Sequence, residues 1–288
     1  MPAEILSDPN VLRICLIAFV TGTLGGLSGV FVVLTKQSLL GDVIAHSTLP
    51  GICFAWWATR SGSNIVLISG ALISGTLAYV FLRLLTYHFL VKPDAALSST
   101  LSIFFGLGIL VLSHLQRVPN VSSAGLERFI FGNLATVTQS DLAFSLALLA
   151  TFVLFLAIVW RRLMINLFDP ILAWTIFGSQ RVTQVGLGLF VILIIGGGLQ
   201  TMGALLITSI LVAPAMAARA WSKRLFPLLM LSGTLGGLSC VLGCLWSAAS
   251  TGVPPGSAST LIALAFVLIS LGVKKWWSST PKFFLWRA

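Results

Sequence analysis

Nine apolar runs, each close to the length of a membrane-spanning helix, follow one another along the chain and are separated only by short polar connections. A transmembrane helix needs about 20 predominantly apolar residues to cross a hydrocarbon core that is about 30 Å thick. Only 8% of the residues are charged, which is too few to cover a soluble domain of 288 residues. We therefore expect an all-α polytopic membrane protein with a single transmembrane domain over residues 1–288. The runs cover residues 11–34, 38–59, 65–87, 95–114, 141–160, 182–199, 202–218, 225–247 and 257–273.

Glycines mark where these runs pack and turn. Gly22, Gly25, Gly26 and Gly29 lie in the first run, and small residues at this spacing let a second helix approach closely. The run Gly196–Gly198 is expected to form a tight reversal between two spans. The count falls from nine spans to eight if one glycine-rich run is re-entrant. All four cysteines fall in apolar runs, where small core residues are expected.

The basic residues fall between the apolar runs instead of forming one stripe, so the net charge of +10 indicates membrane topology and no nucleic-acid partner. With nine spans and the N-terminus outside, most of them lie on one side, which the positive-inside rule assigns to the cytoplasm. The opposite side receives Arg13, Arg60, Arg117 and Arg128. The cytoplasmic set is Lys36, Lys92, Arg161, Arg162, Arg181, Arg219, Lys223, Arg224, Lys274, Lys275, Lys282 and Arg287.

An acid and an imidazole, Asp42 and His46, stand four residues apart inside the second apolar run. On an α-helix this spacing places both on one face, about 6 Å apart along the axis. A carboxylate and a neutral imidazole together suit Mn²⁺, Fe²⁺ or Zn²⁺. A centred Asp costs about 2.5–3.5 kcal/mol to insert into a membrane, so a functional role is expected. The alternative is that Asp42 caps a helix end and His46 packs as a core histidine.

Pro50 and Gly51 are expected to bend the second span just beyond the pair and to free backbone carbonyls there.

The other two histidines, His88 and His114, fall at the ends of apolar runs, where an interfacial imidazole needs no metal.

A short helix is expected at about 168–178, between basic flanks on the cytoplasmic side. Asp169 can serve as its N-cap, Pro170 as its first residue and Gly178 as a left-handed C-cap. Such a helix could dock a partner or lie as an ordinary interfacial helix.

The chain has no phosphate-binding loop of the G-x-x-x-x-G-K-[ST] type, and its connections are too short to hold a nucleotide domain. Transport would therefore be driven by an ion gradient or by a separate ATPase. A gradient-driven carrier usually has several intramembrane acids or interrupted helices in two matching halves. Asp42 is the one acid well inside a span, so the separate ATPase is favoured and the chain itself is expected to be no enzyme.

The run Gln37–Asp42, together with His46 and Leu49–Gly51, resembles the signature of the manganese/zinc/iron ABC transporter permease family. Further motifs of that family follow in the same order along most of the chain. They are Phe105–Gly108, Ala124–Gly132, Phe168–Pro170, and Leu199–Gly203 leading to Leu211–Ala215.

The resemblance implies a multi-pass subunit of a bacterial cytoplasmic membrane. Its partners would be a second permease copy or paralogue, two cytoplasmic ATP-binding subunits and an extracytoplasmic metal-binding protein, besides membrane lipid. The family's pathway residues carry over to Asp42 and His46. The family's coupling helix carries over to Phe168, Asp169, Pro170 and the stretch from Ala173 to Gly178. Ile171 stands where the family often has an acidic residue. The groups of the ATP-binding subunit that this helix contacts are therefore left open.

The metal itself is left open by an oxygen-plus-nitrogen site, because such sites bind divalent ions in the Irving–Williams order. The motifs resemble the manganese-type branch most, so manganese is favoured over zinc or iron as the transported ion, and no resident cofactor is expected. Two other functions remain as alternatives: an ABC permease for siderophores or corrinoids, and a secondary cation/proton transporter.

Overall fold

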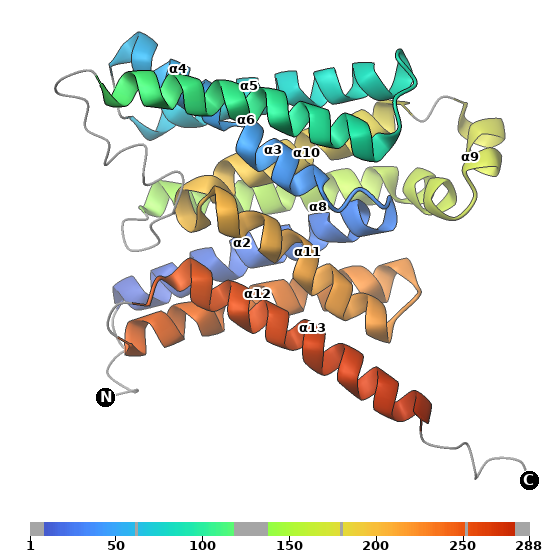
Figure 1. The fold of residues 1–288 in the computed structure, drawn as a ribbon. Coiled ribbons are helices and arrows are strands. Elements are labelled where there is room, and N and C mark those ends of the chain that lie inside the picture. Colours follow the sequence, from blue (N-terminus) through green and yellow to red (C-terminus); the bar gives the residue numbers. More distant parts are fainter. Residues whose placement is uncertain (1–8, 61–62, 118–137, 179–180, 251–252, 280–288) are drawn as a thin grey trace, which may run out of the picture.

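The computed structural model describes residues 9–60, 63–117, 138–178, 181–250 and 253–279, and every regular element in these ranges is an α-helix (Figure 1). This agrees with the expected all-α membrane fold. The expected motif at Ala124–Gly132 lies outside the described residues. The helices are α2 Pro9–Leu34, α3 Leu40–Ser47, α4 Leu49–Thr59, α5 Asn64–Tyr87, α6 Pro93–Gln116, α8 Gln139–Phe168, α9 Pro170–Phe177, α10 Arg181–Met202, α11 Ala204–Trp221, α12 Leu225–Ala249 and α13 Pro255–Ser279.

Seven of the described helices are long and apolar enough to cross a membrane, which is slightly fewer than the expected eight or nine. The difference has two physical causes. The second expected span is divided at Thr48 into α3 and α4, and the apolar part of α11, Leu206–Trp221, is short. The pair α3 and α4 together, and α11 by itself, still run along the length of the bundle (Figure 1). The N-terminal end of α2 and the C-terminal end of α13 therefore lie at opposite ends of the molecule (Figure 1).

Helix α2 lies at the centre of the bundle, and its glycines explain why. A Cβ added at Gly22 or Gly26 would collide with the backbone of α12, and one added at Gly29 would collide with the carbonyl of Leu211 in α11. The missing side chains therefore let α2 pack closely against two helices at once. The hydroxyl of Ser232 closes the contact with α12 by donating to the Gly26 carbonyl at 2.6 Å.

The predicted reversal at Gly196–Gly198 is wrong. These glycines lie inside α10, where an added Cβ would meet the side chains of Leu72, Phe144 and Ile207, so they serve close packing. The chain turns instead at Gly203, which has φ 79° and precedes α11. A positive φ of this kind is accessible to glycine without steric cost.

Short α9 projects at one end of the bundle (Figure 1). The same end holds the last residues of α2, α5, α8, α11 and α13 and the first residues of α3, α6, α10 and α12. The described basic residues of the predicted cytoplasmic set therefore gather at the α9 end. By the positive-inside rule this end faces the cytoplasm.

Candidate functional site: an Asp/His pair and a protruding helix

Asp42 and His46 lie on α3, which is helical from Leu40 to Ser47. One helical turn separates them, so they share a face as the sequence predicted. Both side chains are half-buried, whereas the three residues between them are buried. The shared face of the pair therefore points away from the packed interior of the chain. Figure 1 shows α3 midway along the bundle, between α4 and the end that carries α9.

The polar atoms of this pair have no partner within the described part of the chain. Asp42 does not cap α3: the N-cap residue is Leu39, and the start of the helix has no side-chain cap hydrogen bond. The His46 ring packs edge-on against Phe105 of α6, with ring centroids 5.1 Å apart, and leaves its nitrogens without hydrogen bonds. A carboxylate and an imidazole thus remain available to bind a ligand.

Within the described ranges, no group of three His, Cys, Asp or Glu side chains could hold a metal ion. One copy of the chain therefore offers two candidate ligand side chains at α3. First-row transition metals are usually held by four or more ligands. A complete metal site at this position would need water, backbone oxygens or a second protein copy.

The break after the pair has a clear cause. In a continuous helix the N–H of residue 50 would donate to the His46 carbonyl, but Pro50 has no N–H. Helix α3 ends at Ser47 and α4 begins at Leu49, and Thr48 between them keeps helical dihedrals and donates its backbone N–H to the Ile44 carbonyl at 3.1 Å. The Ser47 carbonyl accepts the hydroxyl of Ser74 from α5 at 2.5 Å. The helix is interrupted close to where the bend was expected, and a side chain of a neighbouring helix satisfies the carbonyl of Ser47.

The exposed face of α6 beside the pair carries small residues at four-residue intervals. Ser98, Ser102 and Gly106 are all exposed, and a Cβ added at Gly106 would meet nothing within 4 Å. Both serine hydroxyls are satisfied by carbonyls one turn earlier in α6. Small residues on a surface of this kind permit close helix packing in membranes. This stripe is not among the features predicted from the sequence, although its four-residue spacing is visible there.

Helix α9 begins and ends as the sequence predicted, with one difference. The Asp169 carboxylate accepts hydrogen bonds from the N–H groups of Ile171 at 3.1 Å and Leu172 at 2.9 Å. Pro170 is at the start of the helix. Gly178 ends it with φ 67° and ψ −138°, a conformation outside the left-handed helical region that was expected, yet one that also favours glycine.

The side chains of α9 divide into an attached face and a free face. Ala173 is fully buried, and the Arg162 guanidinium of α8 lies over the Phe177 ring at 5.4 Å. On the free side, Ile171 is 79% exposed and Trp174 is 68% exposed. Phe168, at the end of α8, is exposed as well. At this end, outside the apolar spans, a large exposed apolar surface is typical of a protein contact.

Comparison with known proteins gives consistent results. The sequence profile described as ABC 3 transport family matches residues 7–274. The zinc transport system membrane protein TroC of Treponema pallidum is 32% identical over 93% of this chain and 90% of its own. The manganese transport system membrane protein MntC of Bacillus subtilis is 32% identical over 92% of this chain, which spans 61% of that longer protein.

A solved structure agrees with these relatives. PsaBC from Streptococcus pneumoniae, in complex with Fab, superposes with a TM-score of 0.80 at 29% identity, over 94% of this chain and 95% of that one. A putative metal-chelate type ABC transporter in an inward-facing conformation has a TM-score of 0.62 at 20% identity, which shows a shared fold. The family expected from the sequence motifs is therefore confirmed, and the chain is a multi-pass membrane protein of the ABC 3 transport family.

Proposed function

We propose that this chain is the membrane-spanning permease subunit of an ATP-driven importer of divalent transition-metal ions in a bacterial cytoplasmic membrane. The observation that carries the proposal is the Asp42/His46 pair, which lies on the face of α3 that points away from the interior of the chain. Its polar atoms have no hydrogen-bond partner among the described residues. Manganese is the favoured ion, with zinc or iron as alternatives. The names of the relatives support this set of ions without choosing within it, since they include manganese and zinc transport proteins.

A second permease subunit completes the metal site. Two copies related by a two-fold axis would bring two Asp42 and two His46 side chains together, giving up to four ligands. The stripe Ser98–Ser102–Gly106 on α6 supports a close contact beside the pair. Water or backbone oxygens would finish the shell, and the ion is cargo that passes through, not a resident cofactor.

Helix α9 couples the permease to a separate ATP-binding subunit. Phe168, Asp169, Pro170, Ala173 and Gly178 have different parts in this role. Asp169, Pro170 and Gly178 define the helix, and buried Ala173 seats it on the bundle. Exposed Phe168, with Ile171 and Trp174, would meet the ATPase. An extracytoplasmic metal-binding protein would deliver the ion at the opposite end of the bundle.

The test is metal uptake by cells that express the whole transporter, with Asp42→Ala and His46→Ala compared at matched expression. Removing one of two ligands from each subunit should lower Mn²⁺ uptake at least about tenfold, equivalent to about 1.4 kcal/mol. His88→Ala is the matched control, because this exposed histidine lies at the end of α5 and outside the proposed contact on α6. Wild-type uptake in both pathway variants would refute the proposed site.

The energy source is tested in the same cells. Uptake should persist when ionophores collapse ion gradients and should stop when ATP is depleted. The opposite dependence would identify a secondary transporter.

A further inference from the structure

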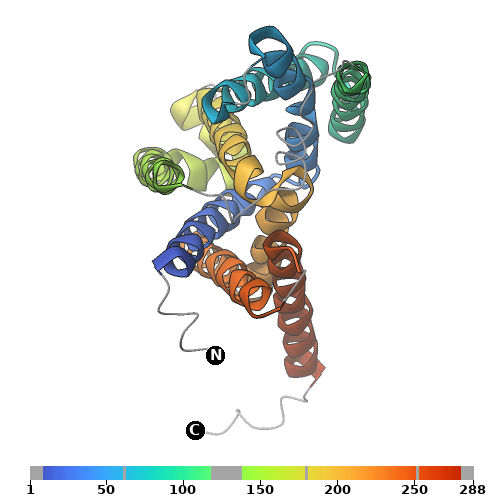
Figure 2. The same ribbon diagram turned by 90° about the vertical axis from the view of Figure 1, so that its left-hand side faces the viewer.

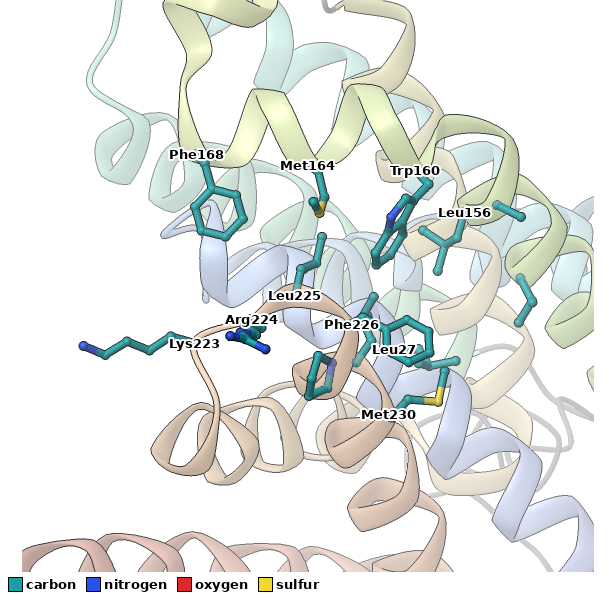
Figure 3. A pocket seen from close by; sticks show the side chains of 14 residues that line it. Leu27, Leu156, Trp160, Met164, Phe168, Lys223, Arg224, Leu225, Phe226 and Met230 are labelled. Carbon is teal, nitrogen blue, oxygen red and sulfur yellow. The ribbon is translucent and has the colours of Figure 1, made fainter. Parts of the chain in front are cut away.

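A groove of about 990 Å³ separates α8 from α12 on the surface of the bundle (Figure 3). Leu27 of α2 lies at its floor. Trp160 of α8 and Phe226 of α12 meet across it in an edge-on contact, with ring centroids 6.2 Å apart. Val153 and Met230 are also exposed along its walls. The lining is almost entirely apolar except at one end.

Positive charge gathers at that end. Lys223 and Arg224 line the groove where α12 begins, and neither forms an ion pair with a described carboxylate (Figure 3). No side chain caps the first turn of α12, so its N–H groups add to the positive potential. An adjoining cavity of about 440 Å³ shares Phe168 and Lys223 and adds two more cations, Arg219 and Lys274.

The groove has the length and position of a lipid molecule in one leaflet. Its lining extends along α8 from Val153 to Phe168, which is about 22 Å of helix. The hydrocarbon of one leaflet is about 15 Å thick. The part of the groove from Val153 to Trp160 therefore lies at the depth of the acyl chains, and the part from Met164 to Phe168 lies at the head-group level. The cationic end is the end that carries α9, on the cytoplasmic side.

The groove also faces away from the proposed permease contact. Figure 2 shows α6, in green, and α8, in yellow-green, on opposite sides of the molecule. A second copy packed against α6 would leave α8 and α12 facing the membrane.

We propose that the α8/α12 groove is a binding site for an anionic phospholipid of the cytoplasmic leaflet. The acyl chains lie along the apolar walls of the groove, against Trp160 and Phe226, and the phosphate lies against Lys223, Arg224 and the start of α12. Anionic head groups attract basic residues at the membrane surface, and a zwitterionic lipid lacks the net charge that this end selects. The inference rests on the permease contact proposed at α6, but it does not depend on Asp42 or His46 binding a metal.

The test uses the assembled transporter in lipid nanodiscs with a phosphatidylglycerol that carries a photoreactive diazirine in one acyl chain. Adducts mapped by mass spectrometry should fall at residues 153–168 and 225–230. Unlabelled phosphatidylglycerol should compete at least fivefold better than phosphatidylcholine. The double variant Lys223→Gln/Arg224→Gln should lower labelling at least fivefold, and Ala157→Phe should do the same by filling the groove.

Matched controls lie on the same helix. Ala150→Phe places the same bulk on an exposed position of α8 outside the groove, and Arg161→Gln removes an exposed cation there. Both should label like the wild type. Three results would each overturn the proposal: equal competition by phosphatidylcholine, unchanged labelling in the charge variant, or labelling of the isolated chain that vanishes on assembly. The last would mean that a protein subunit covers the groove. Metal uptake measured in parallel keeps this outcome separate from the transport function.

Discussion

Asp42 and His46 differ from many small polar side chains of the same bundle in how their polar atoms are satisfied, although the buried hydroxyls of Thr21 and Ser47 also have no partner among the described residues. Ser28 and Thr100, for example, are buried and donate to carbonyls one turn earlier in their own helices. Neither member of the pair has such a partner among the described residues. The four-residue spacing predicted the shared face. The second set of ligands could not be predicted, because a single sequence does not say which copy of a chain completes a site.

Gly26 allows the close packing of α2 against α12 to be tested by adding a single carbon atom. Gly26→Ala would drive a Cβ into the Ser232 carbonyl, and backbone cannot move aside as a flexible side chain can. We expect a loss of about 1–3 kcal/mol in stability, seen as a lower melting temperature in detergent. Gly272→Ala is the control, because a Cβ there meets nothing within 4 Å. It should leave stability unchanged or raise it by up to about 1 kcal/mol.

Arg83 is a second residue whose contacts allow a sharp prediction. Its guanidinium donates to the hydroxyls of Tyr79 at 2.9 Å and Tyr87 at 2.7 Å, and to the Gln184 side chain of α10 at 3.3 Å. It also lies 5.1 Å from the centre of each tyrosine ring. Arg83→Met should cost about 1.5–3 kcal/mol in thermal stability, because hydrogen bonds from a charged group are lost.

Arg83→Lys should recover little of this stability, since an ammonium lacks the planar fork and the stacking. Arg60→Met is the control: its guanidinium is exposed and lies 5.9 Å from the Trp56 ring, a contact worth about 0.5–1 kcal/mol. Equal melting temperatures for Arg83→Met and the wild type would contradict the bridging role of this residue.

At the scale of helices, the apolar runs and the proline and glycine residues that interrupt them predicted most of the fold. The one incorrect turn was predicted at a run of glycines. Pro50 identified a real break because a missing N–H acts locally, whatever surrounds it. Gly196–Gly198 did not form a turn because the same residue type also permits close packing inside a buried helix. Only the backbone of Gly203, with its positive φ, distinguishes the two uses.

Helix α9 combines a local cap with an exposed apolar face, and the two can be separated by mutation. Asp169→Ala removes the acceptor of two N–H groups and should destabilise the helix by about 0.5–2 kcal/mol. Faster hydrogen exchange at residues 171–173 would measure this loss. Asp169→Asn keeps an acceptor and should retain most of the protection.

Trp174→Ala should leave that protection unchanged, because the ring is exposed, yet it should reduce co-purification of the ATP-binding subunit at least about tenfold. Trp276→Ala is the matched control, as this tryptophan is similarly exposed at the end of α13. If the ATP-binding subunit co-purifies equally well with both variants, α9 is not its docking element.

At the scale of the whole molecule, the bundle has two exposed faces of different character. The face with α3 and α6 carries Asp42, His46 and a stripe of small residues. The face with α8 and α12 carries a wide apolar groove that ends in cations. Close helix contact favours small residues, whereas acyl chains fill broad apolar surfaces. The two faces lie on opposite sides, which assigns one to a protein partner and the other to the membrane (Figure 2).

Cross-linking decides between these faces. In a Cys15→Ser background the remaining native thiols, Cys53, Cys240 and Cys244, are buried, so an introduced cysteine is the exposed one among the described residues. Ser102→Cys should give covalent permease dimers with a short bis-maleimide in the assembled transporter, because a two-fold axis beside α3 brings its two copies together. Ala150→Cys, on exposed α8, should remain monomeric. The reverse result would put the protein contact on the face with the groove, and both the shared metal site and the lipid site would then be excluded by one experiment.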